Sequence, residues 1–201
     1  MPMSDEDRNL GDPDGWNRRY EEGTAKWDLG ATPPVVRRLA AAEEGPRRVL
    51  VPGAGYGHDA LGWAAAGHEV VAVDFAPLAV AGMKERAAAA GLRMEVLEAD
   101  VRDLPAEVLG TFDLIWEQTC LCALYPEMRE AYVASMAKAL KPGGRWLGLM
   151  WNNGFEGGPP YDMAPDVVKP LMEAHLEPVE WREVSDALRQ VERLAIYRKP
   201  A

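Results

Sequence analysis

The chain has 201 residues, of which 48% are hydrophobic and 27% charged, so we expect one folded domain over residues 1–201 with a substantial core. Its 32 acidic and 22 basic residues give a formal charge of −10 with no basic run that could neutralise a row of phosphates, so nucleic acid is excluded as an expected partner. No apolar stretch approaches the roughly 20 residues that cross a bilayer, and the first ten residues are acidic where a secretory signal would be basic, so we expect a cytoplasmic protein without a membrane partner.

The first part of the chain predicts a small helical cap. Asp12 or Asp14 is suited to cap a short helix, which would place Trp16 and Tyr20 four residues apart on one face. A second helix is expected over residues 33–44, because prolines suit its first turn and a glycine-proline pair stops it.

From residue 46 onward, strand-like and helix-like segments alternate. Short apolar runs predict strands at 47–53, 68–75, 93–100, 112–118 and 145–151, and helical patterns predict helices at 58–67, 77–91, 126–144 and 165–175. Right-handed crossovers then require a parallel sheet with helices on both faces. The runs 178–184 and 192–199 predict an antiparallel hairpin at its edge. The sequence therefore predicts an α/β, Rossmann-like fold with a mostly parallel seven-stranded sheet in residues 46–201 and the cap in residues 1–45.

A glycine loop follows the first predicted strand. Gly53, Gly55 and Gly57 precede a helix, where missing side chains let the backbone approach a ligand. The spacing is GxGxG, and His58 stands where the dinucleotide fingerprint GxGxxG requires its third glycine, so pyrophosphate binding is disfavoured. Taken by itself, the loop is also compatible with a plain tight turn.

Two aspartates end neighbouring predicted strands. Asp74 lies 21 residues after Gly53, where a carboxylate can accept both ribose hydroxyls of a nucleoside; the alternative is a cap for the helix that starts at Pro77. Asp100 ends the third strand in the same way and would lie beside Asp74 at the same rim. It could accept from an adenine amino group, or it could cap a loop.

The remaining cysteines, histidines and tryptophans carry no metal or redox motif. The two cysteines, Cys120 and Cys122, are expected to be reduced core thiols, because a spacing of two rarely permits an unstrained disulfide. The scattered histidines have no zinc-binding spacing, so no metal is expected. Three tryptophans are expected in the core or on the sheet faces: Trp146, Trp151 and Trp181.

Four ordered stretches resemble the thiopurine S-methyltransferase family, and within it most closely the thiol and halide (thiocyanate) methyltransferases. They are WNRRYEEGTAKWDLGATPP, VLVPGAGYGHD with VVAVDF, FDLIWEQTCLCALYPEMREAYVASMAKALKPGG and GGPPY, and the resemblance covers nearly the whole chain. It implies a class I S-adenosylmethionine-dependent methyltransferase whose N-terminal cap covers the cofactor. The implied acceptor is a small soft nucleophile: a thiol, thiocyanate, a halide or a thiopurine.

The resemblance also implies which residues form the site. The implied cofactor contacts are Trp16, Tyr20, Trp27, Gly53, Gly55, Asp74, Phe75, Asp100, Val101, Glu117 and Gln118, and the implied acceptor pocket contains Trp27, Cys122 and Tyr161. Tyr20 replaces a tryptophan and Gln118 a tyrosine of the closest relatives. Aromatic faces attract cations and exclude water, so the cap rings suit a lid over the sulfonium. Ordinary packing is the alternative for these rings and for the cysteines.

The expected chemistry is an in-line displacement that positions nucleophile, methyl and sulfur, and it needs no catalytic triad. A neutral thiol would need a base. The sequence offers only candidates such as Asp28 or Tyr161, neither of which has a motif of its own, so no catalytic residue is assigned. One alternative is a methyltransferase of the same fold that acts on an oxyanion, a carboxylate or an amine. A second is a nicotinamide-dependent oxidoreductase, which the GxGxG spacing disfavours. A third is a non-catalytic nucleoside sensor. We expect a monomer or a weak homo-oligomer.

Overall fold

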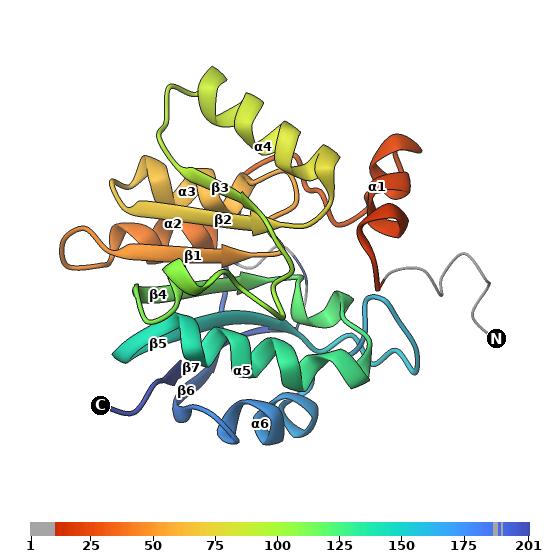
Figure 1. Ribbon diagram of the computed structural model, residues 1–201. Coiled ribbons are helices and arrows are strands. Elements are labelled where there is room, and N and C mark those ends of the chain that lie inside the picture. The colour runs from red at the N-terminus through yellow and green to blue at the C-terminus, as the bar shows by residue number, and fades with distance from the viewer. Residues whose placement is uncertain (1–10, 187–188, 190) are drawn as a thin grey trace.

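The computed structural model describes residues 11–186, 189 and 191–201, and it contains a seven-stranded sheet in the order β3-β2-β1-β4-β5-β7-β6 (Figure 1). The strands are β1 (Arg48–Pro52), β2 (Glu69–Asp74), β3 (Glu95–Glu98), β4 (Phe112–Gln118), β5 (Leu140–Trp151), β6 (Glu177–Glu183) and β7 (Glu192–Arg198). Strands β1 to β5 pair in parallel, and β7 is antiparallel to both β5 and β6. The predicted Rossmann-like sheet with an antiparallel C-terminal hairpin is confirmed. The acidic first ten residues lie outside the described residues.

Helices pack on both faces of the sheet. They are α1 (Pro13–Glu21), α2 (Pro34–Ala41), α3 (His58–Ala65), α4 (Pro77–Ala89), α5 (Arg129–Ala139) and α6 (Pro165–Glu173), with short 3-10 turns at Ala106–Val108, Leu121–Ala123 and Pro126–Met128. Val49 and Val51 of β1 belong to the buried cluster with α2, α3 and α4, whereas Leu50 belongs to the cluster with α5 and α6. Side chains alternate along a strand, so a strand covered on both faces reads as one continuous apolar run.

The boundary between α5 and β5 differs from the prediction. The helix was expected to continue to Gly144, but it ends at Ala139, and residues 140–144 already belong to the strand. Leu140 is fully buried and pairs with Phe112 of β4. Pro142 also disfavours a helical conformation at the residue before it, so the helix ends before the proline-glycine pair.

Helix α1 lies beside the edge at which strands β1 to β5 end (Figure 1). Asp12, and not Asp14, caps it by accepting a hydrogen bond from the Gly15 N–H at 3.1 Å. The Leu78 N–H of α4 donates to Asn17 Oδ1 of α1 at 2.9 Å, which ties α1 to α4. In open parallel sheets this is the edge at which ligands bind. No helix in the described part of the chain is long and apolar enough to span a bilayer.

Candidate active site

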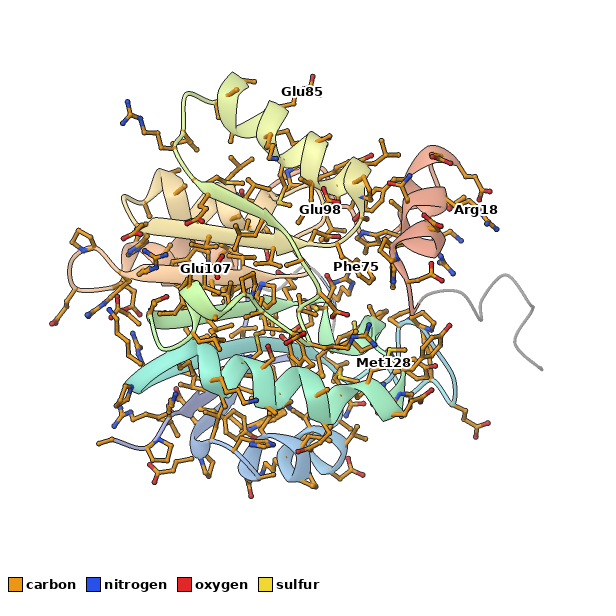
Figure 2. The ribbon with its side chains drawn as sticks, in the orientation of Figure 1. Arg18, Phe75, Glu85, Glu98, Glu107 and Met128 are labelled. Carbon is orange, nitrogen blue, oxygen red and sulfur yellow. The ribbon has the colours of Figure 1, made fainter. Side chains whose placement is uncertain are left out.

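A cavity of about 640 Å³ opens at the carboxyl edge of the parallel strands, within the usual size range of small-molecule sites. Figure 2 shows two residues of its wall, Phe75 and Met128, on the side of the molecule that faces α1. The predicted site residues that line it are Trp16, Tyr20, Trp27, Gly53, Asp74, Phe75, Asp100, Val101, Glu117 and Cys122. The fold thus brings segments that are far apart in the sequence into one wall.

Three predicted site residues lie elsewhere. Gly55 and Gln118 line a smaller cavity of about 60 Å³, which shares Trp27 and Gly53 with the larger one. Tyr161 is absent from the walls of both cavities. Its ring lies 4.8 Å below the Arg129 guanidinium. Its expected place in the acceptor pocket therefore stays a prediction, and the neighbouring Pro159 and Pro160 are the part of this loop that lies in the wall of the larger cavity.

Asp74 organises the glycine loop. Its Oδ2 accepts from the Gly55 N–H and its Oδ1 from the Ala76 N–H, both at 2.9 Å. Helix α4 has no side-chain cap, so Asp74 holds the residue before the helix and does not cap the helix itself. Burial raises the pKa of this carboxyl, against the backbone hydrogen bonds that lower it. Each carboxylate oxygen keeps further acceptor capacity, which is what two ribose hydroxyls require.

The loop itself needs glycine. Gly53 and Gly55 both have φ of 56°, in the left-handed region that other residues avoid. A Cβ added at Gly53 would lie 2.6 Å from Cys120 Sγ, so β1 and the segment after β4 approach each other here without room for a side chain.

Asp100 is already paired with a cation. Arg102 Nε donates to its Oδ1 at 2.9 Å and Arg102 Nη2 to its Oδ2 at 2.5 Å. Burial would raise the pKa of Asp100, but the hydrogen bonds from Arg102 outweigh it and hold the pKa below its ordinary value. A ligand amino group would therefore share an ionised carboxylate with Arg102.

The cap contributes a cluster of aromatic rings. The ring centroids of Trp16 and Trp27 lie 5.1 Å apart, and those of Tyr20 and Trp27 lie 5.5 Å apart, both edge to face. Trp27 Nε1 donates to the Tyr20 hydroxyl at 3.3 Å. Burial raises the pKa of Tyr20, so its phenol stays neutral. All three rings line the cavity, where their faces are suited to a cation and exclude water.

Glu117 is the penultimate residue of β4 and belongs to the wall of the cavity. Its side chain is fully buried, and its Oε1 accepts from the Cys120 N–H at 2.8 Å and the Leu121 N–H at 3.0 Å. Between them Thr119 adopts a left-handed φ of 68°, which turns both N–H groups toward the carboxylate. Glu117 Oε2 has no hydrogen-bond partner among the described residues.

Both cysteines are free and buried, as predicted. Burial raises the pKa of Cys120 well above its ordinary value and that of Cys122 to about 12. They are neutral thiols in the cavity wall and therefore poor nucleophiles. The described residues contain no cluster of three or more side chains suited to a metal ion.

Sequence reasoning missed three further residues of the cavity wall, Trp151, Arg189 and Glu192. Trp151 was expected in the core or on a sheet face, but it is half-buried and lines the cavity, with the Arg189 guanidinium 5.1 Å from its ring. Glu192 holds that arginine: its Oε1 accepts from Arg189 Nη1 at 3.3 Å. The one available signal was a glutamate at the first position of β7. Trp146 is fully buried, as expected, and Trp181 is half-buried.

Comparison with known proteins places this geometry in a family. The chain matches the family model of thiopurine S-methyltransferase over residues 11–197. It is 35% identical over 176 residues to thiocyanate methyltransferase 1 of Brassica oleracea, which covers 85% of this chain and 75% of that protein. It is 28% identical over 194 residues to a thiopurine S-methyltransferase of Xanthomonas campestris pv. campestris, which covers 87% of this chain and 89% of that protein.

A solved structure shares the fold. The 1,6-didemethyltoxoflavin-N1-methyltransferase of Burkholderia thailandensis, determined with 1,6-didemethyltoxoflavin and S-adenosylhomocysteine bound, superimposes with a TM-score of 0.72 at 23% identity. The match covers 100% of this chain and 93% of that one. This chain therefore belongs to the thiopurine S-methyltransferase family, and it is a methyltransferase whose methyl donor is S-adenosylmethionine.

Proposed function

We propose that different residues of the cavity bind different parts of S-adenosylmethionine. Asp74 would hold the ribose, Asp100 and Val101 the adenine, and the cap rings would cover the sulfonium, with the glycine loop beneath. The residues fit this molecule, because a buried carboxylate with spare acceptor capacity stands beside the glycine loop and near a cluster of aromatic rings. When bound, the donor supplies an electrophilic methyl group. In this proposal residues 1–45 are a cap on one domain, with residues 46–201 as its core.

Removal of the Trp27 ring should distinguish a lid from ordinary packing. Trp27→Ala is expected to weaken S-adenosylmethionine binding about 2- to 30-fold more than S-adenosylhomocysteine binding, because only the former carries a charge for the ring to attract, worth about 0.5 to 2 kcal/mol. Calorimetric titration of both compounds measures this ratio. Trp27→Phe, which keeps an aromatic face, is the matched control. Equal losses for the two compounds, together with a lower melting temperature, would support packing.

We propose a small soft nucleophile, such as a thiol, thiocyanate or a halide, as the methyl acceptor. The observation that carries this is the wall near the end of β5, which is apolar, polarisable and rich in sulfur: Cys122, Met150, Trp151, Phe155 and Met163. Such a wall suits polarisable atoms and excludes water. The relationship to the thiocyanate methyltransferase of Brassica oleracea supports the same acceptor class.

The chain's own contribution to catalysis is then mainly positioning. Holding the acceptor in line with the methyl group can contribute roughly 7 to 11 kcal/mol. An anionic acceptor also loses its charge as it reacts with a cation, so a dry cavity favours the transition state. The Arg189 guanidinium, held by Glu192, provides a positive charge in the wall for an approaching anion.

An acceptor panel tests this proposal. Protein and S-adenosylmethionine are incubated with an alkanethiol, thiocyanate, iodide, a thiopurine and selenite, and methylated products are measured by gas or liquid chromatography with mass spectrometry. We expect turnover of at least one sulfur or halide acceptor and little with selenite. Turnover of selenite or of a carboxylate alone would assign a different acceptor class, and S-adenosylhomocysteine binding without any turnover would indicate a nucleoside sensor.

We further propose that the enzyme acts in the cytoplasm as a monomer or weak homo-oligomer. The formal charge of −10 supports a protein that does not bind nucleic acid. Sedimentation velocity measures the oligomeric state, and a filter-binding assay with DNA and RNA tests for nucleic-acid binding.

A further inference from the structure

Glu117 is a buried carboxyl that is only half satisfied. Its Oε1 accepts two backbone hydrogen bonds, whereas Oε2 has none within the described part of the chain, and the residue belongs to the wall of the larger cavity. An unpaired buried carboxylate oxygen is costly in free energy. Such an atom in a cavity wall is suited to a partner that arrives with the ligand.

The described groups that interact electrostatically with Glu117 are acidic or neutral, and a cation in their surroundings, Arg189, acts on Asp59 and Cys122. Asp59 of α3 faces it from one side, Cys120 and Cys122 from the segment after β4, and Tyr132 from α5. The pKa of Glu117 is raised to about 7, mainly by burial. The hydrogen bonds from Leu121 and Cys120 lower this pKa, and the nearby Asp59 raises it further. A carboxyl that exchanges its proton near neutral pH has the right basicity for proton transfer.

The two candidate bases from the sequence, Asp28 and Tyr161, both lie outside the wall of the larger cavity. Asp28 Oδ1 accepts from the Gly30 N–H at 2.9 Å and lies 2.9 Å from His58 Nε2, outside the larger cavity. Tyr161 packs against Arg129 and is not in the cavity wall. Among the wall carboxylates, Asp74, Asp100 and Glu192 each have hydrogen-bond partners on both oxygens.

We infer that Glu117 is the proton acceptor for neutral thiol acceptors, an inference that rests on the proposed function. The thiol sulfur forms a bond to the methyl carbon while the bond from that carbon to the donor's sulfonium sulfur breaks and leaves its electron pair on that sulfur. The S–H proton passes to Glu117 Oε2. The products are a methyl thioether, S-adenosylhomocysteine and a neutral Glu117. Thiocyanate and iodide carry no proton and use the same cavity without this step.

The inference predicts opposite pH behaviour for the two kinds of acceptor. Glu117 must be ionised to accept a proton, so thiol methylation should rise as the pH passes through about 7, below the pH of about 8.5 at which a thiol ionises by itself. Thiocyanate methylation should not rise over this range, because a charged Glu117 repels an anion. A thiol rate that rises only with the ionisation of the free thiol would overturn the inference.

Glu117→Gln tests the role directly, because its amide oxygen can still accept from Cys120 and Leu121. The ratio of alkanethiol to thiocyanate turnover at pH 7 should fall by about 100-fold or more, the scale of general-base catalysis, and should recover at high pH where thiolate is abundant. Asp59→Asn is the matched control, since it neutralises a second buried carboxyl that lies outside the larger cavity. It should leave the ratio within about threefold. An equal loss for both acceptors in Glu117→Gln would show a structural role only.

A spectroscopic readout needs neither donor nor turnover. Infrared difference spectra of the ligand-free protein between pH 6 and 8 should contain a carboxylic acid band that is missing in Glu117→Gln, and its absence from the wild-type spectrum would overturn the inference. If the wild type methylates no acceptor, the proposed function fails. If it methylates both acceptors while the ratio is unaffected in Glu117→Gln, only this inference fails.

Discussion

Replacement of Asp74 by alanine should weaken S-adenosylhomocysteine binding by about 10- to 150-fold, which corresponds to about 1.5 to 3 kcal/mol for hydrogen bonds to a charged group. The carboxylate is buried in the cavity wall, and each of its oxygens has acceptor capacity beyond the bond from Gly55 or Ala76. The variant leaves those two N–H groups without an acceptor, so the melting temperature should also fall. Calorimetric titration well below the melting temperature separates the two effects.

A matched control for this variant stands on the neighbouring strand. Glu98, labelled in Figure 2, pairs with Asp74 in the register of β2 and β3 but is exposed and lies outside the cavity. Glu98→Gln should change the affinity by less than about twofold, since surface substitutions away from a site have small effects. Unchanged affinity in Asp74→Ala would remove this residue from the site and leave it as a support of the loop.

Replacement of Gly53 by alanine should lower the free energy of unfolding by about 2 to 5 kcal/mol, the sum of about 1 to 2 for a left-handed backbone and about 1 to 3 for overpacking. The new Cβ would lie 2.6 Å from Cys120 Sγ and 2.8 Å from its Cβ. Cys120 belongs to the cavity wall, so its displacement should also weaken cofactor binding. Chemical denaturation and calorimetry measure the two quantities.

The two contributions can be separated with a second glycine. Gly67 also has a positive φ, of 92°, but no heavy atom lies within 4 Å of a Cβ built there. Gly67→Ala should therefore lose only the backbone contribution of about 1 to 2 kcal/mol, without a change in cofactor affinity. Adding Cys120→Gly to Gly53→Ala should recover the packing contribution. If Gly53→Ala and Gly67→Ala lower the free energy of unfolding by the same amount, the close approach of Cys120 to Gly53 does not contribute to the loss of stability.

The rim formed by Gly53 and Asp74 was accessible from the sequence because it follows from topology. Consecutive parallel strands joined by right-handed crossovers must end at the same edge, so residues that end β1 and β2 become neighbours without any knowledge of packing. The same reasoning placed Asp100 in this rim but did not identify its partner Arg102, two residues away, because the direction of a loop side chain is not a periodic property.

The α5–β5 boundary was misjudged for a related reason. Helical periodicity and the proline-glycine pair are local signals, whereas the pairing of Leu140 with Phe112 is a contact between distant parts of the chain. Tertiary pairing overrides local preference at element ends, which are the least regular part of any segment.

Composition, periodicity and the order of strand-forming and helix-forming segments suffice for the sheet, the glycine loop and the carboxylate at the tip of β2, because each depends on rules that act along the chain. The apposition of Trp151 and Arg189, the contact of Tyr161 with Arg129 and the unpaired Oε2 of Glu117 required the folded molecule. They depend on which side chains meet across the fold, and such meetings are set by the packing of segments remote in sequence, where no local pattern reports them.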